Sequence, residues 1–186
     1  MLLPAQCPVC RRDGPAPCAR CAAAATPAPR AGAVPAVLAF EGPGRRLLLA
    51  LKYGNAKPVV RSLATAMARL ARRHHVDVVT WAPTSVGRRR RRGYDQAEVL
   101  ARAVAWRLGL PCRGLLRRVD DGPPQTGRSR EERLEGPSFI ARRRVRGSVL
   151  VVDDVVTTGA TLRAAEAALH QAGASAVHCL AAAATP

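Results

Sequence analysis

Apolar residues in this chain gather in short runs that alternate with stretches of helical spacing. The apolar runs predict strands over 34–40, 76–83, 111–119, 147–154 and 176–184. The stretches with helical periodicity predict helices over 44–54, 59–75, 94–109 and 161–172. Apolar strands that alternate with helices are typical of a mostly parallel sheet with helices on both faces, so the pattern predicts an α/β fold.

The first residues follow a different pattern and predict a separate module over 1–25. Two Cys-x-x-Cys pairs occur there, formed by Cys7, Cys10, Cys18 and Cys21. Four thiolates at this spacing are able to hold one tetrahedral Zn²⁺, and the segment has little apolar surface to bury without a metal. A redox pair or two disulfides are the alternatives. We expect residues 26–33 to be a linker and residues 34–186 to form the main domain.

Length and charge limit the choice of function. The 186 residues have room for one α/β core and a small appendage. No apolar run is long enough to cross a bilayer and the first residues do not resemble a signal peptide, so we expect a cytoplasmic protein. Thirty Lys and Arg against thirteen Asp and Glu suggest either a nucleic-acid partner or an arginine-rich background composition. The run 88–92, five consecutive arginines, needs a local reason in either case.

Two of the few acidic residues lie side by side in the stretch SVLVVDDVVTTGATL. Asp153 and Asp154 follow an apolar strand, at the edge of a parallel sheet where ligands bind. The turn Thr157–Thr161 then leads into a helix, whose first amides are suited to hold a phosphate. A carboxylate pair is a good acceptor for two neighbouring hydroxyls, so the layout fits a ribose 5-phosphate. Taken alone, the acidic pair is also compatible with a solvated strand end.

The same stretch resembles the phosphoribosyl pyrophosphate (PRPP) binding motif of type I phosphoribosyltransferases. Nearly the whole chain resembles the ComF (competence protein F, GntX-like) family. The matching pieces occur in family order: the double CxxC, LALKYG, RGYDQAEVLARAVA, LLRRV with PPQTGRSREERL, and VLVVDDVVTTGATL. The resemblance implies a type I phosphoribosyltransferase-like fold with a small N-terminal zinc-finger module built on four cysteines.

The resemblance also implies roles for matched residues. Those expected to bind PRPP are Asp153, Asp154, Thr157, Thr158, Gly159, Ala160 and Thr161. Those expected in a pyrophosphate loop are Thr84, Ser85 and Arg88, and those expected in a flexible hood over 120–138 are Gln125, Thr126 and Arg130. Mg²⁺ would accompany PRPP, and Zn²⁺ would be structural.

Two functions remain open on this resemblance. In the first, the protein transfers a phosphoribosyl group from PRPP to an acceptor that the sequence does not name. In oxopurine phosphoribosyltransferases the third residue after the acidic pair is typically Asp, so Thr157 argues against an oxopurine acceptor. In the second, the protein binds PRPP without turnover and serves natural competence, with single-stranded DNA or a competence helicase as its partner.

Overall fold

The computed structural model describes residues 6–29, 34–53, 57–119 and 137–186. Its centre is a four-stranded sheet of order β1-β6-β5-β2 in which every neighbouring pair is parallel. The strands are β1 (Ala36–Ala39), β2 (Val78–Trp81), β5 (Ser148–Val156) and β6 (Ala176–Ala184). A separate two-stranded antiparallel ribbon joins β3 (Leu116–Arg118) and β4 (Phe139–Ala141).

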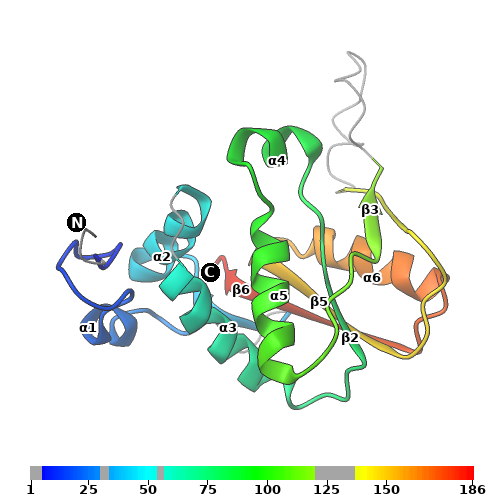
Figure 1. The fold of residues 1–186 in the computed structure, drawn as a ribbon, viewed down its shortest axis with the longest axis horizontal. Helices are drawn as coiled ribbons and strands as arrows, with labels where there is room; N and C mark the ends of the chain where they lie inside the picture. The colour runs from blue at the N-terminus through cyan, green and yellow to red at the C-terminus, as the bar shows by residue number, and fades with distance from the viewer. Residues whose placement is uncertain (1–5, 30–33, 54–56, 120–136) are drawn as a thin grey trace.

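Helices cover both faces of the sheet, as the alternating pattern predicts (Figure 1). The helices are α1 (Ala19–Ala23), α2 (Gly42–Tyr53), α3 (Lys57–Ala71), α4 (Val86–Arg92), α5 (Gln96–Leu108) and α6 (Ala160–Gln171). Helices α2, α3 and α5 pack with Leu150 and Val152 of β5 on one face. Helix α6 and the β3–β4 ribbon pack with Val149 and Val151 on the other. Side chains alternate between the two faces along a strand, so the unbroken apolar run of β5 serves both cores.

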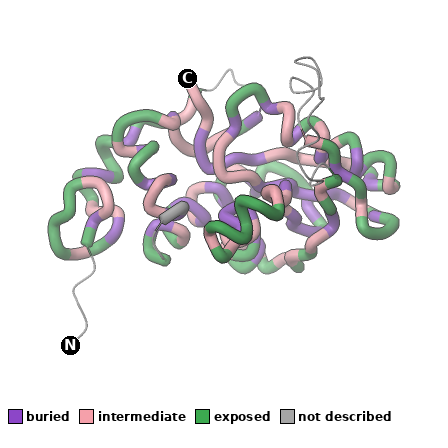
Figure 2. Tube along the Cα trace, turned by 90° about the horizontal axis from the view of Figure 1, so that it is seen from above, coloured by how far each residue is buried: buried purple, intermediate pink, exposed green. Residues whose placement is uncertain are grey.

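Burial follows this layering. Buried residues run through the middle of the molecule, and exposed residues lie on the outer surfaces of the helices (Figure 2). Among the described helices, none is both long and apolar enough to span a membrane.

Several elements differ from the sequence expectation. Strand β5 does not end at the acidic pair but continues to Val156, because residues 155 and 156 still pair with β6. Within the stretch 111–119 only Leu116–Arg118 is a strand, and it pairs with β4 rather than with the parallel sheet. Helix α4 forms where the sequence predicted no helix: Ser85 caps it, and arginine is a good helix former.

The N-terminal segment packs against the rest of the chain. Thr26 and Ala28, which lie in the expected linker, exchange backbone hydrogen bonds with Ala39 and Val37 of β1. The Arg46 guanidinium on α2 donates to the Val9 carbonyl at 3.2 Å. The segment 26–28 therefore covers the edge of β1, and the Arg46 side chain on α2 contacts the cysteine module.

Candidate functional site

The acidic pair lies in the C-terminal half of β5. Asp153 and Asp154 are half-buried, and a carboxylate oxygen of each accepts the next backbone N–H, at 2.7 and 2.8 Å. Burial raises the pKa of Asp153 well above its usual range, and the negative charges of Asp154 and Asp95 add to this effect. A group that binds here gains most if it supplies hydroxyl donors or a cation to these oxygens.

The turn after β5 follows from one glycine. Gly159 has a φ of +77°, which a residue without a side chain adopts at no steric cost, and it is the N-cap of α6. It gives the helix no side-chain cap. The Arg163 guanidinium donates to the Thr158 carbonyl at 2.7 Å and braces the turn from within the helix. The start of α6 thus presents backbone amides beside two exposed threonines, Thr157 and Thr158.

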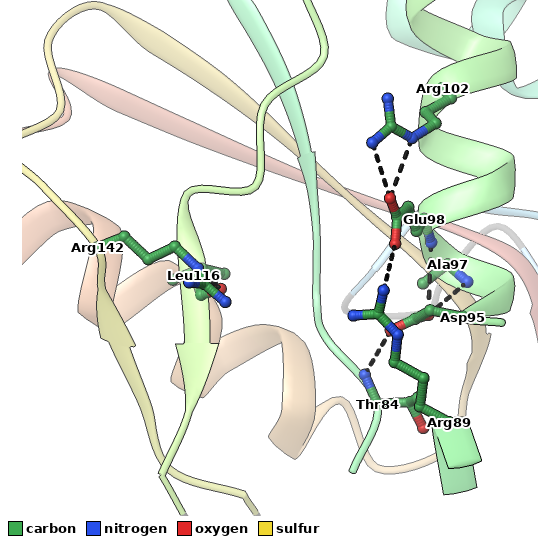
Figure 3. Close-up of polar contacts among 8 residues, drawn as sticks. All are labelled: Thr84, Arg89, Asp95, Ala97, Glu98, Arg102, Leu116 and Arg142. Carbon is green, nitrogen blue, oxygen red and sulfur yellow. Dashed lines mark hydrogen bonds and ion pairs between the residues drawn. The ribbon is translucent and has the colours of Figure 1, made fainter. Parts of the chain in front are cut away.

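The loop after β2 is held by a buried carboxylate. Asp95 is 3% exposed; one of its oxygens accepts the Thr84 N–H at 2.8 Å, and the other accepts the N–H groups of Ala97 and Glu98 (Figure 3). Burial raises the pKa of Asp95, and the three backbone donors oppose that rise. The same Asp95 carboxylate therefore caps α5 and fixes the loop 82–85.

Helix α4 carries the arginine run out from this loop. The Ser85 hydroxyl caps it by accepting the Arg88 N–H at 3.4 Å. Glu98 of α5 forms ion pairs with Arg89, at 4.0 Å, and with Arg102, at 2.8 Å (Figure 3). Arg89, one residue of the arginine run, therefore has a partner within the chain, because its ion pair with Glu98 links α4 to α5.

These segments meet around one cavity of about 140 Å³. Its lining includes five of the residues predicted from the sequence: Asp153, Asp154, Thr161, Thr84 and Arg88. The predicted residues that do not line it are Ser85, Thr157, Thr158, Gly159 and Ala160. Thr157, Thr158 and Gly159 form the turn before α6, and Ala160, directly before Thr161, is the first residue of that helix. The predicted hood residues Gln125, Thr126 and Arg130 lie outside the described part of the chain.

Sequence reasoning missed several residues of the cavity. Arg92, Asp95, Gln96 and Arg118 line it as well. Arg118 is the last residue of β3. The Leu116 carbonyl of the same strand accepts a hydrogen bond from the Arg142 guanidinium at 3.1 Å (Figure 3). Two stretches quoted in the sequence analysis contain these positions, although no site role was assigned to them: RGYDQAEVLARAVA includes Arg92, Asp95 and Gln96, and LLRRV includes Arg118.

The four N-terminal cysteines form a second candidate site. Their sulfur atoms all lie within 4.8 Å of one another, and those of Cys10 and Cys18 are 3.8 Å apart. Burial opposes ionisation of Cys7, but backbone hydrogen bonds from Cys18, Cys10 and Val9 outweigh it and lower the pKa of Cys7 to about 6. Burial and the neighbouring thiols raise the pKa of Cys21 to about 12. Four converging sulfur atoms fit the donor set of a tetrahedral Zn²⁺. Four thiolates this close repel one another, and the positive charge of the metal would offset that repulsion.

Part of the chain is similar to a known protein family. Residues 95–186 match the phosphoribosyl transferase domain family. No curated protein shows significant sequence similarity to the chain.

Solved structures are similar to this chain to different degrees. The glutamine phosphoribosylpyrophosphate (PRPP) amidotransferase from B. subtilis, complexed with ADP and GMP, is 24% identical with a TM-score of 0.50. A structure described as the allosteric regulatory enzyme of purine biosynthesis is 22% identical with a TM-score of 0.49. Each of these matches covers 72% of this chain and only 30% of the other. The purine phosphoribosyltransferase from Pyrococcus horikoshii is 19% identical with a TM-score of 0.38, over 66% of this chain and 70% of that one.

The expected fold class is confirmed: a parallel sheet lies between helices, and a cysteine cluster suited to zinc precedes it. Residues 95–186 are similar to a phosphoribosyl transferase domain, and the fold is that of the type I phosphoribosyltransferases.

Proposed function

We propose that the chain is a ComF-family phosphoribosyltransferase-like protein that binds PRPP and transfers its phosphoribosyl group to an acceptor, releasing diphosphate. The observation that carries this proposal is the composition of one cavity. Carboxylates from β5 and arginines from α4 and β3 line the same space. The ribose hydroxyls of PRPP are suitable donors for the carboxylates, and its diphosphate is a suitable anion for the arginines.

Asp153 and Asp154 accept the two ribose hydroxyls in this proposal. The turn Thr157–Thr161 holds the 5-phosphate with its hydroxyls and with the first amides of α6, which the helix dipole makes favourable for an anion. The start of α6 is compatible with this role, because Gly159 offers no side-chain acceptor at the N-cap and the Ala160 N–H makes only a long hydrogen bond, 3.4 Å, to the Thr158 hydroxyl, which an anion is able to replace.

Thr84, Ser85 and Arg88 receive the diphosphate. The anchor at Asp95 supports their role, because it fixes the Thr84 backbone beside the cavity. Mg²⁺ prefers oxygen ligands, and the acidic pair offers carboxylate oxygens next to the proposed phosphate oxygens. When bound, Mg²⁺ would neutralise part of the charge on the leaving diphosphate.

The reaction proposed for this site breaks the bond between the anomeric carbon and the diphosphate oxygen while the acceptor attacks that carbon. Positive charge develops on the ribose ring, near the acidic pair, and the departing diphosphate takes both electrons of the broken bond. The arginines that line the cavity favour that departure electrostatically.

We also propose that residues 1–25 form a zinc module, that residues 26–33 connect it, and that residues 34–186 form the phosphoribosyltransferase-like domain. The cysteine geometry supports the module. The Arg46–Val9 contact supports a structural role, since it links the module to α2.

The proposal is tested by diphosphate release from PRPP and Mg²⁺ in the presence of cell extract, which supplies the acceptor. The wild type releases diphosphate, and Asp153→Asn loses this activity. Asp13→Asn is the matched control, because Asp13 is exposed and does not line the cavity. Equal release by Asp153→Asn and the wild type would remove the acidic pair from the reaction.

A non-catalytic role in competence is the second candidate, and one observation favours it. Residues 88–91 of α4 are exposed arginines, which are suited to meet a polyanion such as single-stranded DNA. This candidate predicts DNA binding that weakens steeply with salt, together with PRPP binding and no diphosphate release.

A further inference from the structure

A buried glutamine in the cavity wall has an unused hydrogen-bond donor. Gln96 is the first residue of α5 and is 3% exposed. Its Oε1 accepts from the Arg92 guanidinium at 2.9 Å. Its Nε2 is buried and has no hydrogen-bond partner among the described residues.

An unpartnered amide nitrogen at this depth is costly, because it has lost its hydrogen bonds to water without replacing them. The Arg107 Nε atom is in the same condition, but Arg107 does not line the cavity and its Nη2 bonds the Arg61 carbonyl. Gln96 differs because it does line the cavity. A bound molecule is therefore able to supply the acceptor that the described part of the chain does not.

The surroundings define that acceptor. Three arginines (Arg88, Arg92, Arg118) and three carboxylates (Asp95, Asp153, Asp154) line the same cavity. Three backbone N–H groups already bond Asp95, and Arg92 contacts Gln96 directly, so a bound anion meets a cationic partner beside Gln96. Arg92 also fixes the orientation of the amide, since it occupies Oε1 and leaves Nε2 as the end of the amide that still needs an acceptor. A group with an anionic oxygen fits this arrangement, and a group with a hydroxyl or amine donor fits it less well.

We propose that Gln96 is a specificity residue for the diphosphate of PRPP: its Nε2 donates a hydrogen bond to a diphosphate oxygen, while Arg92 holds the amide in register. This inference rests on the proposed function. It adds a way to distinguish PRPP from ribose 5-phosphate, which carries the same ribose hydroxyls and 5-phosphate but no diphosphate. A site discriminates best when a ligand that lacks the group leaves a buried donor unpaired.

Calorimetric titrations of Gln96→Glu with three probes test the inference. The substitution keeps an acceptor for Arg92 and replaces the Nε2 donor with an oxygen. We expect PRPP and inorganic diphosphate, each with Mg²⁺, to bind about tenfold more weakly or worse, and ribose 5-phosphate to change by less than about twofold. Gln171→Glu is the matched control, because Gln171 is exposed at the end of α6 and is expected to leave all three affinities unchanged.

Equal weakening of PRPP and ribose 5-phosphate by Gln96→Glu would overturn the inference, since that result indicates a structural role. Unchanged PRPP affinity would overturn it as well. If the wild type binds ribose 5-phosphate and PRPP equally well, this inference fails and the proposed sugar-phosphate site stands. If the wild type binds neither, both fail.

A second measurement uses the wild type and so does not depend on the folding of a variant. Nitrogen-15 NMR of the Gln96 side-chain amide should show a shift when inorganic diphosphate and Mg²⁺ are added, and none when ribose 5-phosphate is added. An amide signal indifferent to diphosphate would contradict the contact.

Discussion

Replacing Gly159 with alanine tests how the turn after β5 builds the site. A β-carbon at a φ of +77° costs about 1–2 kcal/mol, because left-handed backbone crowds any L side chain. The new atom would also lie 2.9 Å from Arg163 Nη1 and displace it. Loss of the exposed Arg163–Thr158 hydrogen bond adds about 0.5–1 kcal/mol. We therefore expect Gly159→Ala to lower the free energy of unfolding by about 2 kcal/mol in urea titrations.

Gly109→Ala is the matched control for this variant. Gly109 has a φ of +69° at the end of α5, but an added β-carbon would meet no atom of the described residues within 4 Å. Gly109→Ala should lower the free energy of unfolding only by the cost of a left-handed backbone, about 1–2 kcal/mol, and should bind PRPP like the wild type. Gly159→Ala should bind PRPP more weakly, because the turn proposed to hold the 5-phosphate moves. If both variants bind PRPP equally, or if Gly159→Ala is as stable as the wild type, the reasoning about this turn is wrong.

Other predictions concern the remaining anchors of the fold and site. Asp95→Ala removes the cap of α5 and the acceptor for the Thr84 N–H, so urea titrations should show a loss of about 2–4 kcal/mol; a loss under about 0.5 kcal/mol would contradict the anchor. Because Asp153 has a raised pKa, the folded protein holds its proton more tightly than the unfolded chain. Its contribution to the free energy of unfolding is greatest below pH 3.8, an ordinary Asp pKa, and falls as pH rises through the raised value; Asp153→Asn should flatten this part of the stability profile, and an unaltered profile would argue against the shift. The reduced protein should contain about one zinc per chain by elemental analysis, and chelation should lower its melting temperature; metal-free protein with an unchanged melting temperature would refute the zinc module.

The sequence predicted the fold and the acidic edge because both depend on local pattern. The apolar run before Asp153 specifies a buried strand, and the carboxyl end of a parallel strand is where side chains meet a ligand. The glycine in the following turn marks the start of α6 for the same local reason.

The rest of the cavity depends on contacts between segments distant in the sequence. Arg118 reaches it only because β3 pairs with β4, and a three-residue strand such as β4 leaves almost no periodic signal. Helix α4 was missed because five adjacent arginines suggest a solvated loop, whereas Ser85 and the ion pairs to Glu98 stabilise a helix. Nor does the polar character of Gln96 reveal that Arg92 occupies its Oε1 and that no other described residue accepts from its Nε2, since both depend on where Arg92 points.

The central claim is that Asp153 and Asp154 grip the hydroxyls of PRPP, and calorimetry with PRPP and Mg²⁺ tests it most directly. We predict that the wild type binds and that Asp154→Ala weakens binding by about 1.5–3 kcal/mol, the worth of a charge-assisted hydrogen bond, whereas Asp13→Ala leaves it unchanged. Absence of binding to the wild type, or an undiminished affinity in Asp154→Ala, would contradict the claim.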